Sequence, residues 1–130
     1  MDNNIGSKGG CIWILSSEFD ANASFFTDNK AIQGGVIFAI QKSYFQIRSS
    51  LLFGNIADDG GIIYAMSCKN LVDGRRARYI DLMNDEGQLV PSLLFLDSEM
   101  SYNWAIQNMM QIILSDAHIS NCNIRDNYSY

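Results

Sequence analysis

One fifteen-residue pattern occurs twice in this chain, and the repeat constrains the fold more than any other feature. Residues 26–40 align with residues 52–66 without a gap, at an offset of 26 residues. Six of the fifteen pairs are identical, whereas unrelated segments of ordinary composition share about one. The identical pairs are Asn29/Asn55, Ala31/Ala57, Gly34/Gly60, Gly35/Gly61, Ile37/Ile63 and Ala39/Ala65. The sequence therefore predicts a repeat protein.

A third copy lies upstream, at an offset of 25 residues. It consists of Asn4, then Gly9-Gly10, then the apolar run 11–15. The shared frame is an apolar residue, two variable positions, Asn, four residues, Gly-Gly and about five apolar residues. A period of about 25 residues is too short for a self-contained domain, so each unit must bury its apolar face against its neighbours.

The spacing of the apolar runs indicates β-strands rather than helices. Each run after Gly-Gly is short and bounded by glycines, and a second alternating stretch, residues 44–49, lies between two of them. At about 3.3 Å per strand residue, such a unit travels once around a narrow coil and returns one strand spacing higher. The fold class expected is all-β, a parallel β-helix of four to five rungs. A leucine-rich repeat would need a helical half and a Leu-x-x-Leu-x-Leu frame, and neither is found.

The repeated glycines and asparagines have mechanical explanations. Gly-Gly before a strand permits a backbone conformation that a Cβ atom would block. Asparagines stacked in register can hydrogen-bond along a ladder. The predicted structural residues are Asn4, Asn29, Asn55, Asn127, Gly9, Gly10, Gly34, Gly35, Gly60 and Gly61.

The frame resembles a known repeat family. Phe26-Thr27-Asp28-Asn29 and Gly34-Gly35-Val36-Ile37 are similar to the paired Phe-x-x-Asn and Gly-Gly-Ala-Ile motifs of polymorphic outer membrane protein repeats. That family is similar to the pectin-lyase-like right-handed β-helices, so the resemblance implies a right-handed coil and an adhesin-like role at a cell surface or outside the cell. The resemblance is good over residues 1–70, partial over 112–130 and poor over 71–111.

The region 71–111 is expected to be an irregular rung with a loop insertion within a single 1–130 segment. Val90–Leu96 reads as a degenerate post-glycine strand in which Pro91-Ser92 replaces Gly-Gly, with extra loop residues around Arg75. Residues 98–114 allow a helix or strands, and strands are preferred. This preference follows because residues 117–127 repeat the alternation of residues 45–55.

Composition excludes several classes. The 130 residues carry a formal charge of −5, which argues against a general nucleic-acid binder. No apolar run of about 18 residues that could span a membrane and no signal peptide are visible. Met1 and Tyr130 both fall inside the repeat frame, so the chain is expected to be a fragment of a longer repeat protein, without its caps.

Few residues suggest chemistry, and no cofactor or metal is expected. Weak ligand candidates are the acidic pair Asp58 and Asp59 and the basic cluster Arg75, Arg76 and Arg78. Cys11, Cys68 and Cys122 show no metal-ligand spacing, and His118 has no nearby second ligand. The aromatic column Trp13, Phe38 and Tyr64 reads as packing, although an outward-facing column would instead favour stacking on sugars.

The sequence favours a non-catalytic structural or adhesive segment of a larger surface protein. Its expected partners are neighbouring rungs of the same longer chain and, beyond them, glycans or a surface protein of the host or cell. The alternative is a fragment of a polysaccharide lyase or glycoside hydrolase. That alternative requires Asp58, Asp59, Asp81, Asp85 and Arg75 to meet in one groove. Two sequons, at Asn22 and Asn127, permit an extracellular eukaryotic setting.

Overall fold

The computed structural model describes residues 1–41, 43–66, 68, 93–113, 115 and 117–129. These residues form seventeen short strands. They are β1 (Ile5–Lys8), β2 (Ile12–Leu15), β3 (Glu18–Asn22), β4 (Phe25–Thr27), β5 (Lys30–Gln33), β6 (Ile37–Ile40), β7 (Tyr44–Arg48), β8 (Leu51–Phe53), β9 (Ile56–Asp59), β10 (Ile63–Met66), β11 (Leu93–Leu96), β12 (Glu99–Ser101), β13 (Trp104–Ala105), β14 (Met110–Ile113), β15 (Ala117–Ser120), β16 (Asn123–Arg125) and β17 (Tyr128–Ser129).

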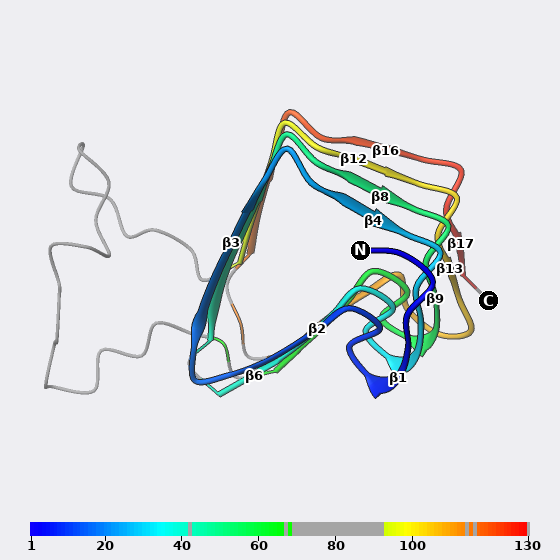
Figure 1. Cartoon of the computed structure of the whole chain (residues 1–130), viewed down its shortest axis with the longest axis horizontal. Coiled ribbons are helices and arrows are strands. Elements are labelled where there is room, and N and C mark those ends of the chain that lie inside the picture. The colour runs from blue at the N-terminus through cyan, green and yellow to red at the C-terminus, as the bar shows by residue number, and fades with distance from the viewer. Residues whose placement is uncertain (42, 67, 69–92, 114, 116, 130) are drawn as a thin grey trace, which may run out of the picture.

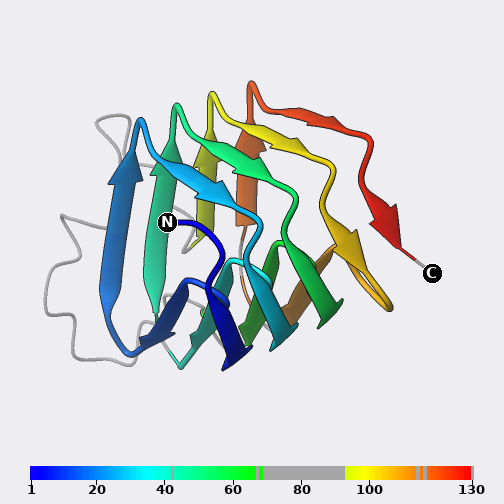
Figure 2. The same ribbon diagram turned by 45° about the vertical axis from the view of Figure 1, so that its right-hand side comes forward.

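Every fourth strand belongs to the same sheet. The first sheet has the order β1-β5-β9-β13-β17, the second β2-β6-β10-β14, the third β3-β7-β11-β15 and the fourth β4-β8-β12-β16. All pairings are parallel. Figure 1 shows the coils lying over one another around four sides, and Figure 2 shows them climbing from blue to red. The predicted fold class, an all-β right-handed parallel β-helix, is confirmed, and its about four coils agree with the four to five rungs expected.

The corners of the coil are made by residues in the left-handed region of backbone space. One such residue lets a strand end and the next begin at a new angle. The fourth-to-first corner holds Asn3, Asp28, Gly54, Tyr102 and Asp126; the first-to-second holds Gly9, Gly34 and Gly60; the second-to-third holds Ser16 and Gln41; and the third-to-fourth holds Ala23, Ser49, Asp97 and Asn121. The same corner therefore recurs at the same place in successive coils.

Alternate side chains of each strand fill the interior. The fourth sheet contributes a column of large residues, Phe26, Leu52 and Met100, all at most 2% exposed. The first sheet contributes a column of small residues, of which Ala31, Ala57 and Ala105 are buried. Large side chains on one wall and small ones on the adjacent wall allow a narrow coil to pack without voids. The third sheet adds Phe45 and Phe95, whose rings pack edge to face with centroids 5.4 Å apart.

One strand lies in a different sheet from the one predicted. Leu93–Leu96 (β11) pairs with Tyr44–Arg48 (β7) in the third sheet, so the interpretation of 90–96 as a post-glycine strand is wrong. The extra residues of this coil come earlier, between β10 and β11, so the chain has already passed the second sheet when β11 begins. Arg75 and most of this stretch lie outside the described residues.

The later part of the chain follows the sequence analysis more closely. Strands rather than a helix form within residues 98–113, as preferred. Ile124 pairs in register with Met100, which pairs with Leu52. The predicted equivalence of Ile124 and Leu52 is therefore confirmed.

Candidate functional site

A file of asparagines runs through the coil at the corner between the fourth and first sheets. Up to the last member, the Nδ2 atom of each asparagine donates to the Oδ1 atom of the asparagine in the next coil, at 2.9 Å in all four bonds. The backbone N–H of the same residue donates to that Oδ1 atom as well, at 2.9 to 3.1 Å. The file contains Asn4, Asn29, Asn55, Asn103 and Asn127. The ladder expected from the sequence is present.

The remaining amide protons of the file also have acceptors. Asn55 Nδ2 donates to the carbonyl oxygen of Phe26 at 2.9 Å, and Asn103 Nδ2 donates to that of Leu52 at 2.9 Å. The side chains of Asn29, Asn55 and Asn103 are fully buried. Because an unpaired polar group in the interior costs about 1–3 kcal/mol, complete pairing lets these amides lie inside an apolar core.

Sequence reasoning missed Asn103. It is 48 residues beyond Asn55, whereas the other steps of the file are 24 to 26 residues. The signal was present, since Met100-Ser101-Tyr102-Asn103 fits the apolar-x-x-Asn frame. It was hidden because Asn108 and Met109 take the place of Gly-Gly in this coil, where Gly61 N–H bonds to the Asn108 carbonyl.

The paired glycines form a second file, and the stacking of Gly9, Gly34 and Gly60 agrees with the sequence analysis. Gly34 has a φ of 68°, and its partner Gly35 approaches the next coil closely. A Cβ atom on Gly35 would lie 2.1 Å from the carbonyl oxygen of Gly61. Only glycine permits this approach of one coil to the next.

The aromatic column lies on the outer face of the second sheet. Trp13, Phe38 and Tyr64 are in register on neighbouring strands, while the residues on either side of each face the core. Phe38 and Tyr64 stack with centroids 5.3 Å apart, and the Lys8 ammonium lies 5.0 Å from the centre of the Phe38 ring. Phe38 is 3% exposed and Trp13 62%. Phe38 and Tyr64 therefore pack on each other, whereas the Trp13 ring at the end of the column is exposed.

The rest of this outer face is also apolar. Its eight outward positions are Trp13, Leu15, Phe38, Ile40, Tyr64, Met66, Gln111 and Ile113. Gln111 is the one residue of the eight without an apolar body. Sheets covered on both sides have this composition, whereas a solvent face usually alternates with polar residues. This face, which we call the apolar face, is the surface best suited to contact another molecule.

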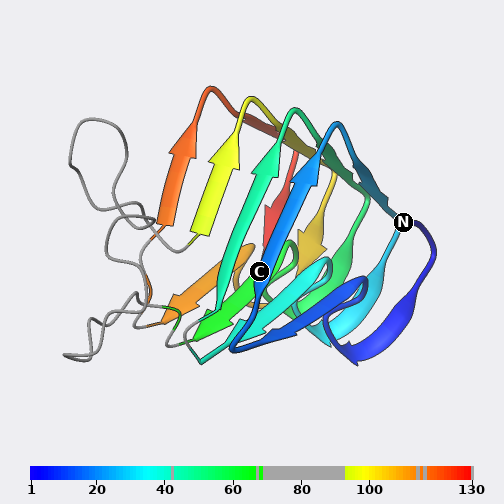
Figure 3. The ribbon, with the colours of Figure 1, turned by 60° about the vertical axis from the view of Figure 1, so that its left-hand side comes forward.

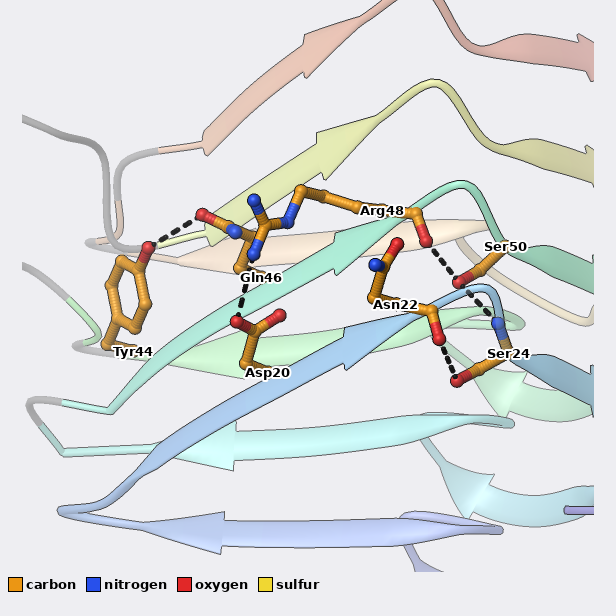
Figure 4. A network of polar contacts seen from close by, with 7 residues as sticks. All are labelled: Asp20, Asn22, Ser24, Tyr44, Gln46, Arg48 and Ser50. Atoms are coloured by element: carbon orange, nitrogen blue, oxygen red, sulfur yellow. Dashed lines mark hydrogen bonds and ion pairs between the residues drawn. The ribbon is translucent and has the colours of Figure 1, made fainter.

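The outer face of the third sheet is polar by contrast. Figure 4 shows Arg48 bridging to Asp20 on the preceding coil, at 3.1 Å, and the Tyr44 hydroxyl 3.0 Å from the Gln46 amide. At the adjacent corner, Ser24 N–H donates to the Ser50 hydroxyl at 3.1 Å. The Arg48–Asp20 and Ser24–Ser50 contacts connect one coil to the next, as the asparagines do inside, whereas the Tyr44–Gln46 contact lies within β7.

A shallow groove of about 460 Å³ follows this corner on the outside. Its lining includes Phe25, Leu51, Asp97 and Glu99. Glu99 is already bound to Arg125 at 2.8 Å, and this bond, together with one from Ser101, lowers the pKa of the Glu99 carboxyl. The carboxylate is thus occupied by neighbours within its own sheet.

The weak ligand candidates are only partly described. Asp58 is exposed on β9, and Asp59 accepts a hydrogen bond from Asn108 at 3.0 Å. Arg75, Arg76, Arg78, Asp81 and Asp85 lie outside the described residues. Within the described ranges, no group of three or more His, Cys, Asp or Glu side chains is close enough to hold a metal ion.

The cysteines are free thiols, and two of them are shielded. Burial raises the pKa of Cys11 to about 11, against the lowering effects of the amino terminus and Asn4. Burial also raises the pKa of Cys68, which lies in the core. Cys122 lies at a corner, where its Sγ atom is 3.3 Å from the Ser120 carbonyl oxygen. Because the thiolate is the reactive form, burial makes Cys11 and Cys68 less nucleophilic.

The two sequons differ in accessibility. Asn22 is exposed at the end of β3. Asn127 belongs to the asparagine file: its Nδ2 atom donates to Met100 at 2.7 Å and its Oδ1 atom accepts from Asn103. A glycan on Asn127 would replace one proton of this Nδ2 atom, which already uses the other in its bond to Met100.

Comparison with protein-family models, with curated proteins and with solved structures finds no match for this chain. The described residues include no helix long and apolar enough to cross a bilayer.

Proposed function

We propose that this chain is a non-catalytic structural or adhesive repeat segment of a larger cell-surface or extracellular protein. The observation that carries the proposal is the asparagine file. Five asparagines link successive coils through the interior by paired amides, and three of these side chains are fully buried. Such a stack behaves as a stiff rod, because each coil holds its neighbours by side chains as well as by backbone.

The adhesive part of the role is assigned to the apolar face. Trp13 offers an exposed ring, and Lys8 and Gln33 lie at the end of the adjoining strands of the first sheet. Aromatic rings pack on the apolar face of a sugar, while amides and ammonium groups bond to its hydroxyls. The resemblance to surface-protein repeats supports the same role, and the expected ligand class is a glycan.

A binding measurement tests the proposal. The chain is applied to a glycan array and to immobilised polysaccharides, beside the variant Trp13→Ala. The matched control is Phe25→Ala, since Phe25 is 65% exposed on the fourth sheet, compared with 62% for Trp13. Binding that Trp13→Ala weakens at least about tenfold, and Phe25→Ala leaves unchanged, supports the assignment. If Trp13→Ala and Phe25→Ala bind equally well, the apolar face is not the glycan-binding surface.

The enzymatic alternative is tested separately. The chain is incubated with pectate and with alginate, and new reducing ends are measured against a buffer control. Turnover above the control contradicts a non-catalytic role. Substitution of both Asp58 and Asp59 by Asn then tells whether the acidic pair is responsible.

A further inference from the structure

The outer face of the first sheet is apolar at positions where a sheet facing solvent usually has polar residues. Its strands point alternate residues into the core, namely Ala31, Ala57 and Ala105. The outward residues of its three middle coils are Lys30, Ile32, Ile56, Asp58, Trp104 and Ile106. Four of these six are large and apolar, and Ile32 and Ile106 are 56% and 45% exposed. We call these six residues the first-sheet face.

The strands of the first-sheet face have a neighbour on each side. β5 lies between β1 and β9, β9 between β5 and β13, and β13 between β9 and β17. The face therefore keeps its surroundings whether or not further coils precede or follow residues 1–130. Figure 3 shows the third sheet in front and the first sheet behind it, on the opposite side of the coil. The polar outer face of the third sheet thus points away from the first-sheet face.

One cation and one anion lie on the first-sheet face. Lys30 and Asp58 are exposed on neighbouring strands, and Lys30 is in register with Ile56, two residues before Asp58. Among the described residues, neither of the two charged side chains forms an ion pair or a hydrogen bond. The face therefore presents two unpaired and opposite charges within an apolar surface.

We propose that two copies of the chain associate side by side through their first-sheet faces, about a two-fold axis. In a two-fold contact the same surface of each copy is used, so every contact between two different residues occurs twice. Lys30 of each copy then pairs with Asp58 of the other, and the isoleucines around them are removed from water. The inference goes beyond the proposed function, because it concerns a different face and needs no glycan.

The spacing of the two charges selects the direction of the contact. On each face Lys30 and Asp58 are one strand spacing apart, about 4.8 Å, and two residues apart along the strand direction, about 6.6 Å. A two-fold axis parallel to the coil and midway between them leaves one strand spacing between opposite charges and two residues between like charges, measured along the face. An axis along the strands reverses this order and brings like charges closer. The two coils therefore run side by side in the same direction.

The net charge of the chain also favours this face. The whole chain carries a formal charge of −5, so two copies repel each other overall. The six residues of the first-sheet face carry one positive and one negative charge, so contact through them brings no excess of like charge together. A face of this size is small beside a standard interface of about 800 Å² per partner, so the expected dissociation constant lies above about 1 μM.

Sedimentation equilibrium from about 10 μM to about 1 mM protein tests this inference. We expect a monomer–dimer equilibrium that does not grow further, because a two-fold contact is closed. Ile32→Lys and Ile106→Lys place a charge in the apolar part of the contact and should each raise the dissociation constant at least about tenfold. The matched control is Leu15→Lys, since Leu15 and Ile106 are both 45% exposed but Leu15 lies on the second sheet. Circular dichroism checks that each variant folds.

Exchange of the charges tests the ion pairs. Lys30→Glu or Asp58→Lys alone sets like charges against each other and should raise the dissociation constant at least about threefold. The double variant restores opposite charges and should return the constant to within about twofold of the unchanged chain. Carbodiimide coupling of a mixture of unlabelled and isotopically labelled chains, followed by mass spectrometry, should give an amide that joins Lys30 of one copy to Asp58 of the other.

Three results would overturn the inference: a monomer at every concentration, growth beyond a dimer, or equal effects of Leu15→Lys and Ile106→Lys. A double charge variant that associates no better than the single ones overturns the pairing of Lys30 with Asp58. Glycan binding is measured at Trp13 on the second sheet, so either proposal can fail alone.

Discussion

The Nδ2 atom of Asn29 donates to the Oδ1 atom of Asn55 at 2.9 Å, and both side chains are fully buried. The two residues are 26 positions apart in sequence and one coil apart in space. Asn55 Oδ1 also receives the backbone N–H of Asn29, so one carbonyl oxygen satisfies two donors. Nothing else in the described interior connects the coils through side-chain amides in this way, and the file therefore fixes their register.

Removal of one member of the file should be strongly destabilising. Asn55→Ala leaves two Asn29 donors without the Asn55 Oδ1 acceptor, while the Asn103 Oδ1 atom keeps only the backbone N–H of residue 55 as a donor from this coil. We expect a loss of about 3 kcal/mol in the free energy of unfolding, measured by urea denaturation.

The control for this prediction is Asn108→Ala. Asn108 makes one exposed bond, to Asp59, and its removal should cost less than about 0.5 kcal/mol. Equal losses for Asn55→Ala and Asn108→Ala would show that the file does not stabilise the fold.

The glycine file should not tolerate a methyl group. In Gly35→Ala the new Cβ atom meets the Gly61 carbonyl at 2.1 Å, so the coils must separate. We expect a loss of about 3 kcal/mol or more, seen as a lower midpoint in thermal unfolding followed by circular dichroism.

Gly54→Asn is the contrasting variant. Gly54 has a φ of 65°, but the same corner is occupied in other coils by Asn3, Asp28 and Asp126 at positive φ. The nearest atom to a new Cβ is the side-chain oxygen of Asp28, which can move. Gly54→Asn should therefore change stability by less than about 1 kcal/mol, and a loss as large as that of Gly35→Ala would contradict this account.

The Cys11 thiol should react slowly with alkylating reagents in the folded protein. Burial raises its pKa to about 11 from an ordinary value of 9.0. At pH 8 this lowers the thiolate fraction about a hundredfold. Its reaction with iodoacetamide, followed by mass spectrometry of the Cys11 peptide, should accelerate as the pH rises toward 11. Unfolding in urea should restore the ordinary pKa and the faster reaction of Cys11. Equal reaction rates in the folded and denatured chains would contradict the raised pKa of the Cys11 thiol.

The surface ion pair should matter little. The Arg48 and Asp20 side chains are 45% and 56% exposed, so water screens their attraction. Asp20→Asn should cost less than about 1 kcal/mol in urea denaturation. A double-mutant cycle with Arg48→Gln isolates the pair, and a coupling as large as the loss in Asn55→Ala would show that the outer network, rather than the file, holds the coils together.

Much of the fold could be predicted from sequence because the repeat is local. Gly34 and Asn29 recur as Gly60 and Asn55 because every coil meets the same three requirements: a left-handed backbone at one corner, a close approach to the next coil and an amide partner in that coil. The parallel β-helix and four members of the asparagine file, Asn4, Asn29, Asn55 and Asn127, therefore followed from spacing.

The tertiary structure decided what depends on pairing between distant segments. Leu93–Leu96 lies in the third sheet, and Asn103 joins the file 48 residues after Asn55. The long coil changes the number of residues between equivalent positions, but the strands still stack in the same order. Burial was likewise beyond the sequence: Trp13 and Phe38 share one column, yet one is 62% exposed and the other 3%. The repeated residues determined how each coil turns, whereas contacts between coils determined which residues meet and which face outward, since those contacts join segments that no local pattern relates.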